Sequence, residues 1–339
     1  MIKKRNLDNS LIQWIMMQTG LGPGIGEVKY VAPATSSTSQ YRTQLESNNV
    51  SSGDIFTTLA LTEAALVAYR NDIALIMPGA YLETAELDWD KNNTHIMGLA
   101  GPNTMGDHSE PGVSIYTTGT GVVNTIHVTG PYSQFININI VNNGANAACL
   151  AAVYLDTYGT TWRSCGIMGN MNSTQNAVVA AASLYLHTNA HYPFFDDCQI
   201  GSDVWGLRAA ALSGQVYFSG SQPNGGKFRD CSFRSISDTA TCAMVTTKGS
   251  GTPVGRGWIF DRCHFGNFSS VGPTAMNNVF YGYGAGAWWP IVLKNCSSQG
   301  YDEWTDQDNN YLLADMPAVD TGGGITRPQT AVTYSGTDR

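Results

Sequence analysis

Residues 195–201 read FDDCQIG: a large apolar residue, two polar residues, a cysteine, a polar residue and an apolar residue. Four other segments follow or approach this template, namely WRSCGIM (162–168), FRDCSFR (228–234), FDRCHFG (260–266) and LKNCSSQ (293–299). Their cysteines are Cys165, Cys198, Cys231, Cys263 and Cys296, and successive cysteines are 33, 33, 32 and 33 residues apart. A fixed period of this length indicates a solenoid, in which each repeat stacks on the one before it.

The residues between the cysteines favour strands over helices. Helical repeats of similar length need two amphipathic helices each. Here, short runs such as QVYFSG (215–220) and GWIF (257–260) are rich in β-branched and aromatic residues, and Gly, Asn, Ser and Pro separate them. The small-residue runs AVVAAASLYL (177–186) and GLRAAAL (206–212) are interpreted as inward-packed strands as well. The sequence therefore predicts an all-β protein that forms a parallel β-helix.

The template also predicts a bend within each repeat. Phe195 and Cys198 are three residues apart, so they cannot share one face of a straight strand, whose faces alternate with period two. We expect the bend at Asp196 and Asp197, because aspartate tolerates the left-handed conformation. Cys198 and Ile200 then both point inward. The five repeat cysteines are predicted to form a structural column of buried, free thiols, one in each rung.

The segment 60–103 precedes these repeats and has a different character. Thr62 is expected to cap a short helix over 63–70, followed by the buried strand IALIM (73–77) and a turn at Pro78 and Gly79. This order resembles the N-terminal cap and first rungs of right-handed β-helices of the pectin-lyase-like superfamily. The resemblance implies a single-stranded right-handed parallel β-helix over 55–304, with a cap helix at its start. Residues 1–54 and 305–339 are expected to form irregular N- and C-terminal arms.

Composition limits the classes of partner. The net charge is −8 and only 13% of residues are charged, which argues against nucleic acid as a partner. No apolar run reaches the length of a signal peptide or a membrane span, so we expect a soluble chain made in a cytoplasm. Cofactors and metals are not expected: no C-x-x-C pair occurs, and DQDNN (306–310) lacks the glycine of an EF-hand loop. The pair His187 and His191 is assigned to a loop.

Catalytic motifs of the superfamily are incomplete. DDC (196–198) resembles the middle motif of polygalacturonases, but the NTD, SHG and RIK motifs of that family are absent from the sequence. The positions two before each cysteine alternate in charge, and they read Arg163, Asp196, Arg229, Asp261 and Lys294. One position later, Asp197 and Asp230 would stack as like charges, which would raise the pKa of one of them or attract a cation unless Arg262 relieves it. No catalytic residue is assigned, and Asp197 and Asp230 are the weak candidates.

These features together resemble bacteriophage virion proteins built on the β-helix. The resemblance implies a non-enzymatic capsid decoration or cement protein in the virion, made in the host cytoplasm. It would be a homotrimer whose arms clamp the major capsid protein and other virion proteins. Two alternatives stay open: a polysaccharide-degrading enzyme of tailspike or lyase type, and a glycan-binding fibre module without turnover. The aromatic residues Trp288, Trp289, Tyr281 and Tyr283 are interpreted as core packing, a subunit interface or a sugar-stacking surface.

Overall fold

The computed structural model describes most of the predicted solenoid. The described residues are 26–32, 39–100, 112–118, 121–169, 171–202, 207–208, 213–219, 223–237, 239–247, 254–268, 276–282, 291–305 and 312–314. Three of the four aromatic residues singled out above, Tyr283, Trp288 and Trp289, lie outside these ranges, as do DQDNN and most of both expected arms.

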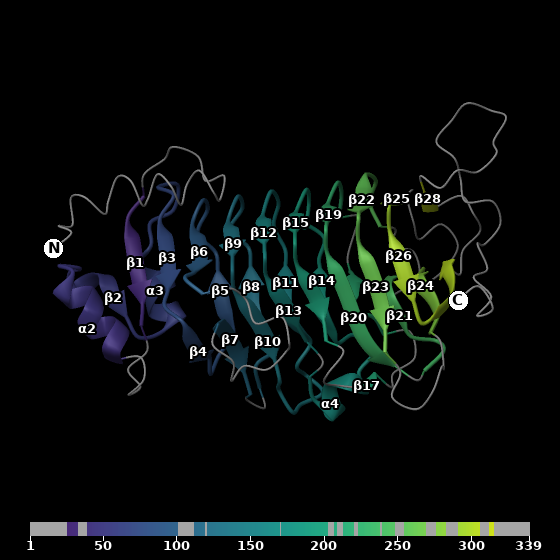
Figure 1. Cartoon of the computed structure of the whole chain (residues 1–339), viewed down its shortest axis with the longest axis horizontal. Helices are drawn as coiled ribbons and strands as arrows, with labels where there is room; N and C mark the ends of the chain where they lie inside the picture. Colours follow the sequence, from purple (N-terminus) through teal and green to yellow (C-terminus); the bar gives the residue numbers. More distant parts are fainter. Residues whose placement is uncertain are drawn as a thin grey trace.

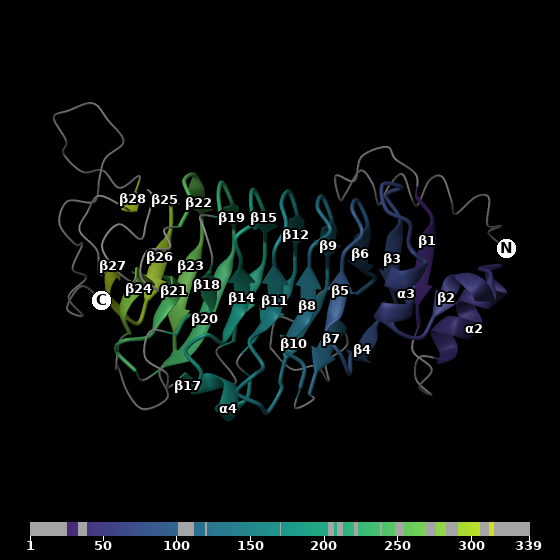
Figure 2. The same ribbon diagram turned by 180° about the vertical axis from the view of Figure 1, so that it is seen from behind.

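Three parallel sheets run along the molecule (Figures 1 and 2). Sheet A contains β2 (Ile55–Phe56), β1 (Val28–Val31), β3 (Ile73–Ile76), β6 (His95–Gly98), β9 (Gln134–Ile136), β12 (Thr161–Arg163), β15 (Phe194–Asp196), β19 (Lys227–Arg229), β22 (Trp258–Asp261), β25 (Ile291–Lys294) and β28 (Leu312–Ala314). Sheet B contains β4 (Gly79–Leu82), β7 (Val113–Thr117), β10 (Asn139–Asn142), β13 (Gly166–Met168), β16 (Gln199–Gly201), β20 (Ser232–Ser237), β23 (His264–Asn267) and β26 (Ser297–Gln299), with β17 (Leu207–Arg208) beside β20. Sheet C contains β5 (Leu87–Trp89), β8 (Asn124–Val128), β11 (Ala151–Leu155), β14 (Ala182–Leu186), β18 (Val216–Phe218), β21 (Ala243–Thr247), β24 (Met276–Tyr281) and β27 (Tyr301–Thr305).

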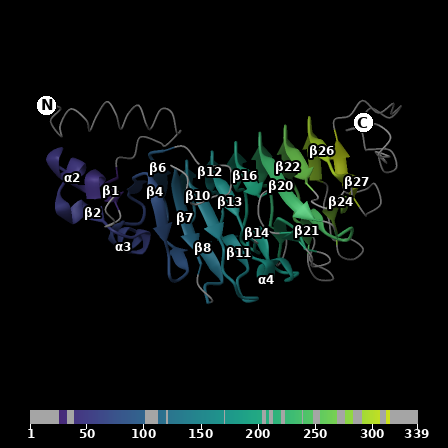
Figure 3. The ribbon, with the colours of Figure 1, turned by 60° about the horizontal axis from the view of Figure 1, so that its bottom comes forward.

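Each turn of the chain visits sheets A, B and C in order and returns one rung further on. The strands of sheet B lie side by side in Figure 3. Equivalent template positions pair across the rungs, as Phe195 does with Trp162 on one side and Phe228 on the other. This topology confirms the predicted right-handed parallel β-helix and explains the period, because one repeat equals one complete turn.

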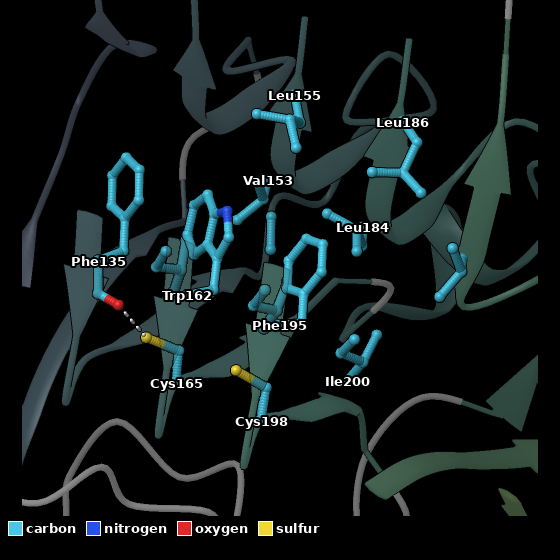
Figure 4. Packing of buried hydrophobic residues seen from close by; sticks show 14 of the residues in the cluster. Phe135, Val153, Leu155, Trp162, Cys165, Leu184, Leu186, Phe195, Cys198 and Ile200 are labelled. Carbon is cyan, nitrogen blue, oxygen red and sulfur yellow. Dashed lines mark hydrogen bonds between the residues drawn. The ribbon is translucent and has the colours of Figure 1, made fainter. Parts of the chain in front are cut away.

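A ladder of aromatic rings fills the interior along sheet A. The ring centroids of Phe135 and Trp162 are 3.9 Å apart, and Phe195 follows at 5.8 Å from Trp162 (Figure 4). Phe228 continues the ladder 4.6 Å beyond Phe195, and Phe260 lies 4.8 Å beyond Phe228. All five side chains are fully buried, so stacked rings of this kind form the core of every rung they occupy.

The repeat cysteines lie beside this ladder on the inner side of the bend. All five are free thiols; four are buried and Cys296 is partly exposed. The thiol of Cys165 donates to the carbonyl oxygen of Phe135 at 3.3 Å, one rung back (Figure 4). Burial, first of all, raises the pKa of Cys165 and of Cys231, which keeps these thiols protonated.

The cap helix begins earlier than the sequence indicated. Helix α3 spans Leu59–Ala65, and Thr58 is its N-cap. The backbone of Thr58 is extended, and its Oγ1 accepts a hydrogen bond from the Leu61 amide at 3.2 Å. Thr62, the predicted cap, is instead buried inside the helix and donates its hydroxyl to the Thr58 carbonyl oxygen. The prediction of a helix over 63–70 was therefore wrong, because Leu66 is extended and Tyr69 has a positive φ of 64°.

The sheet also extends into the segments assigned to arms. Strand β1 pairs with β2 and β3, so sheet A already begins within 1–54. That segment also contains α2 (Ser39–Ser47) and the 3-10 turn η1 (Ser52–Asp54), and β28 lies within 305–339. A short α4 (Ser173–Asn176) lies between sheets B and C. Among the described helices, none is long and apolar enough to cross a membrane.

The bend between sheets A and B is built in the same way in successive rungs. Its residues have φ between 49° and 54°, and they are Asn137, Ser164, Asp197, Asp230, Arg262 and Asn295. We call this set the bend column. The bend predicted at Asp196 and Asp197 is confirmed: β15 ends at Asp196, Asp197 is left-handed, and β16 begins at Gln199. Asparagine and aspartate dominate the column because they occupy this conformation at the smallest steric penalty after glycine.

Candidate functional site

The two candidates from the sequence, Asp197 and Asp230, lie in the bend column, where residues of neighbouring rungs bind both carboxylates. Arg262 binds Asp230 with both ends of its guanidinium, Nε to Oδ1 at 2.7 Å and Nη2 to Oδ2 at 2.8 Å. The Ser164 hydroxyl donates to Asp197 Oδ2 at 2.9 Å. Hydrogen bonds from Arg262, first of all, lower the pKa of the Asp230 carboxyl, which is the outcome expected if Arg262 pairs with it. Arg262 therefore relieves the stacking of like charges.

Among the alternating charges next to this column, Asp196 pairs with both neighbours as predicted, whereas Asp261 pairs with Lys227 and Arg262. Arg229 binds Asp196 through Nε to Oδ1 at 2.7 Å and Nη2 to Oδ2 at 2.6 Å. Arg163 approaches the same carboxylate from the other side, 3.5 Å from Oδ2. Asp261 is nearly buried and lies 3.0 Å from Lys227 Nζ. The acidic and basic groups on this edge of the solenoid are thus used to hold rungs together.

A different arrangement occurs on the outer face of sheet C. Val153 and Leu155 point into the core, so Tyr154 between them points outward. Strand register aligns outward-facing residues in one line, namely Asp88, His127, Tyr154, Tyr185 and Tyr217. Adjacent members touch: the His127 ring is perpendicular to Tyr154 at 5.0 Å, and Tyr154 stacks on Tyr185 at 4.8 Å. This face therefore carries an aromatic line with an acidic and imidazole end.

Three ionisable groups gather at that end. His127 Nδ1 lies 3.4 Å from Glu86 Oε1 and 3.3 Å from Asp88 Oδ1. The Glu86 carboxylate raises the pKa of His127, against the opposing effect of partial burial. Burial acts to raise the pKa of Glu86, but the neighbouring His127 and the hydrogen bonds from Asn124 outweigh it, and the net shift is downward. We call Glu86, Asp88 and His127 the carboxylate–imidazole cluster.

A second acid and imidazole pair lies at the end of the strands of the same sheet. Asp156 follows β11 and His187 follows β14, and His187 Nδ1 is 3.0 Å from Asp156 Oδ1. The His187 ring also packs against Tyr154 with 5.3 Å between centroids. Asp156 Oδ1 further accepts the amide of Asn189 at 3.1 Å. His191 lies apart from this pair, since its Nδ1 accepts the Asn224 amide. The spacing of His187 and His191 therefore has no shared role.

The corner between sheets C and A carries a second left-handed column. Its residues have positive φ and are joined rung to rung by backbone hydrogen bonds: Tyr69, Asn93, Tyr132, Gly159, Tyr192, Gly225 and Gly257. Tyrosine occupies the first, third and fifth of these positions. Tyr69, Tyr132 and Tyr192 are 75%, 53% and 64% exposed. We call these three residues the tyrosine column.

The backbone conformation does not explain why the tyrosine column is aromatic. A left-handed conformation is unfavourable for a bulky residue, and glycine serves at three other positions of this corner. Two of the rings lie over a glycine of the next rung: a Cβ at Gly159 would be 2.7 Å from Tyr132 Cδ1, and one at Gly225 would be 2.3 Å from Tyr192 Cδ1. Strained, exposed residues held by their surroundings are typical of functional surfaces.

Sequence reasoning missed this surface although the repeat contains its signal. The residue three before the large apolar template position reads Tyr132, Gly159, Tyr192, Gly225 and Gly257. Glycine at this position indicates a left-handed turn, so tyrosine at the same position indicates an exposed ring. The carboxylate–imidazole cluster has no such signal, because it depends on the register between β5 and β8, which precede the cysteine repeats.

Solved pectin methylesterases are similar to this chain in fold. A pectin methylesterase mutant in complex with a hexasaccharide has a TM-score of 0.52 at 15% identity, over 84% of this chain and 80% of that one. Pectin methylesterase PemA from Erwinia chrysanthemi has a TM-score of 0.50 at 14% identity, covering 84% and 80% of the two chains. Escherichia coli YbhC has a TM-score of 0.50 at 14% identity, covering 91% and 82%. Neither a family model nor a curated protein matches the sequence. The likeness shows a right-handed parallel β-helix like that of pectin methylesterases.

Proposed function

We propose that this protein binds a polysaccharide along the corner between sheets C and A and the adjoining outer face of sheet C. The observation that carries the proposal is the tyrosine column: three exposed tyrosines, each at a positive φ, on every second rung. A non-glycine residue in this conformation costs about 1–3 kcal/mol, so three such residues need a compensating role. Sugar rings bind proteins largely by stacking their apolar faces on aromatic rings, which is such a role.

The spacing of the tyrosine column favours a polymer over a single sugar. Rungs are about 4.8 Å apart, so tyrosines on alternate rungs are separated by roughly 10 Å along the solenoid axis. This is about the length of a disaccharide unit in an extended chain. A polysaccharide lying along the axis would place every second ring over Tyr69, Tyr132 and Tyr192. The line of Tyr154 and Tyr185 on the neighbouring face would contact the same chain from the side.

Charge favours a neutral polysaccharide. Glu86, Asp88 and Asp156 lie along the same face, and the whole chain carries a net charge of −8. A polyanion would be repelled by these groups at low salt. An uncharged or methyl-esterified chain would not be. The mutant pectin methylesterase that binds a hexasaccharide shares the fold, which supports an extended glycan as the occupant.

The proposal is tested by glycan-array binding of the full chain, with neutral and acidic polysaccharides printed side by side. We expect binding to neutral glycans, and a loss of about 10–100-fold in affinity in the double variant Tyr132→Gly/Tyr192→Gly, from two lost stacking contacts. Leu82→Ala is the matched control, because Leu82 is an exposed apolar residue on β4 in sheet B. Unchanged affinity in the double variant would refute the tyrosine column as the binding surface.

An enzymatic reaction on the bound glycan is the competing form of this proposal. Its support is the convergence of Glu86, Asp88 and His127 on the same face, since carboxylates and imidazole are the usual acids and bases of such reactions. Reducing-end release from a polysaccharide that binds the wild type, and its loss in Asp88→Asn, would establish turnover. Binding without release of new ends would leave the protein a binding module.

A virion decoration protein is the second candidate function. The bend column and the ion pairs beside it support this candidate, because their charged groups join neighbouring rungs, as suits a rigid structural rod. The clamping of capsid subunits by the arms, the homotrimer and the virion location belong to this candidate. Mass spectrometry of purified virions tests it by copy number: hundreds of copies support decoration, and absence from the particle refutes it.

A further inference from the structure

We propose that the carboxylate–imidazole cluster is a binding site for a divalent transition-metal ion. Glu86, Asp88 and His127 each offer one ligand atom, and these three atoms all lie within 4.8 Å of one another. They come from β5, the residue before it and β8, so two rungs build the site. The site lies on the same face as the proposed glycan surface, but the inference does not depend on glycan binding.

The distances suit a shared metal better than direct hydrogen bonds. His127 Nδ1 is 3.4 Å from Glu86 Oε1 and 3.3 Å from Asp88 Oδ1. An N–H···O hydrogen bond is usually about 2.7–3.2 Å long, so neither contact has its optimal length. A tetrahedral zinc ion with bonds of about 2.0–2.2 Å holds its ligand atoms about 3.3–3.6 Å apart. A small displacement of the three side chains would therefore complete three coordination bonds.

Two of the three ligands are already oriented. Glu86 Oε2 accepts hydrogen bonds from the backbone amide of Asn124 at 2.9 Å and from its side-chain amide at 2.8 Å. These bonds direct the other oxygen, Oε1, toward His127. The His127 ring is held perpendicular to Tyr154 at 5.0 Å between centroids. Outer contacts of this kind fix ligand geometry in metal sites, which makes Asn124 a positioning residue.

The third ligand leaves the site open to solvent. The Asp88 side chain is 69% exposed, in contrast to 29% for Glu86 and 27% for His127. Three protein ligands and an accessible fourth position are the arrangement of reactive zinc sites, where water completes the coordination. A ligand set of one imidazole and two carboxylates favours zinc or a similar first-row metal over calcium or magnesium, which prefer oxygen ligands alone.

The same face provides a matched control. Asp156 and His187 form an acid and imidazole pair with 3.0 Å between Oδ1 and Nδ1, at comparable exposure. Among the described residues, Glu86, Asp88 and His127 form the one group of three or more histidine, cysteine or acidic side chains that is close enough to hold a metal. The pair of Asp156 and His187 therefore has the same chemistry without the third ligand.

The inference is tested by titrating the tag-free full chain with zinc chloride, following bound zinc by calorimetry and by elemental analysis after dialysis. We expect one equivalent of zinc per chain. Because losing an outer-sphere contact weakens metal sites by about 10–100-fold, we expect His127→Gln and Asp88→Asn to lose more than about 100-fold in affinity. Asn124→Ala should lose about 10–100-fold in zinc affinity. His187→Gln should bind zinc as the wild type does.

Cobalt substitution identifies the donor atoms. Cobalt bound by one imidazole and two carboxylates gives visible d–d bands without the near-ultraviolet charge-transfer band of a thiolate. A thiolate band would place the metal on a cysteine and overturn the proposal. Failure of the wild type to bind zinc would overturn it, as would unchanged affinity in His127→Gln. If the wild type binds glycan but not zinc, only the metal proposal fails. If it binds zinc but not glycan, only the glycan proposal fails.

Discussion

Two columns of left-handed residues run along this solenoid, and they differ in what fills them. The bend column between sheets A and B contains residues such as Asp197 and Asp230 that tolerate the backbone, and its charges pair across rungs. The corner between sheets C and A carries exposed tyrosine, which the backbone disfavours, at three positions between asparagine and glycine residues. In a repeat protein, a residue that suits its repeat position is explained by architecture, and one that opposes it indicates function.

The largest effect is expected in the interior, beneath both columns. Phe228 stacks between Phe195 and Phe260, at 4.6 and 4.8 Å, and is fully buried. Phe228→Ala should lower the free energy of unfolding by about 3–5 kcal/mol, from lost burial and the cavity left behind. Denaturant unfolding followed by circular dichroism measures it. A loss below about 1 kcal/mol would mean that the aromatic ladder does not hold the rungs on which both columns depend.

The second largest effect is the pH dependence of the free energy of unfolding, which we expect to come from the buried His95 and not from the surface columns. Burial lowers the pKa of His95 in β6 from 6.5 to about 4. The folded protein therefore resists protonation that the unfolded chain accepts, so stability is full above about pH 6.5 and falls as the pH is lowered toward 4. The loss should be about 3 kcal/mol across this window.

His95→Gln provides the comparison for this pH dependence. The variant has no imidazole at this position, so the difference in unfolding free energy between the two proteins should shrink by about 3 kcal/mol as the pH falls from 6.5 to 4. Thermal and denaturant unfolding at several pH values give this difference. Parallel curves for the two proteins would show that His95 is protonated as easily in the folded state as in the unfolded chain.

Removing a carboxylate next to the bend column should lower the free energy of unfolding more than removing one from the outer face of sheet C. Asp196→Ala breaks a two-pronged ion pair with Arg229 and a contact with Arg163, at a side chain that is only 13% exposed. We expect it to lower the unfolding free energy by about 1–2 kcal/mol. Asp156→Ala removes the contact with His187 and one hydrogen bond from the Asn189 amide, and should cost less, about 0.5–1 kcal/mol. Equal losses in denaturant unfolding would remove the distinction between a structural edge and a functional face.

The smallest expected effect has the opposite sign. Tyr192 has a φ of 55° and is 64% exposed, so Tyr192→Gly relieves backbone strain and loses the contact of its ring with Gly225. The unfolding free energy should stay the same or rise by up to about 1 kcal/mol, since strain relief offsets the greater freedom of glycine in the unfolded chain. Asp197→Gly in the bend column should instead be neutral or destabilising, because its hydrogen bond to Ser164 is lost. A clear loss of stability in Tyr192→Gly would make the tyrosine structural.

The sequence predicted the parts of the fold that repeat. The spacing of the cysteines, the bend at Asp197 and the pairing of Asp196 with Arg229 all follow from aligning equivalent positions of successive rungs. The start of α3 was misplaced because Thr58 and Thr62 both have the side chain of a helix cap, and only the extended backbone at Thr58 decides between them.

The candidate site was less predictable, for two different reasons. Tyr132 and Tyr192 occupy a repeat position that the alignment contains, so attention to where glycine alternates with an aromatic residue would have found them. Glu86 and His127 are 41 residues apart in rungs without the cysteine template, and only the pairing of β5 with β8 brings them together. Contacts set by strand register in irregular rungs cannot be read from a single sequence.

The most direct test of the tyrosine column as a binding surface is the dependence of glycan affinity on glycan length. If alternate sugar rings stack on Tyr69, Tyr132 and Tyr192, the affinity of the wild type for neutral β-linked oligosaccharides should rise in steps of two sugars. It should level off once the chain spans all three residues. Tyr132→Gly should remove the middle step and leave the first one. Calorimetric titration with oligosaccharides of increasing length measures this series. An affinity that is independent of length, or unchanged by Tyr132→Gly, would contradict the assignment of this column to glycan binding.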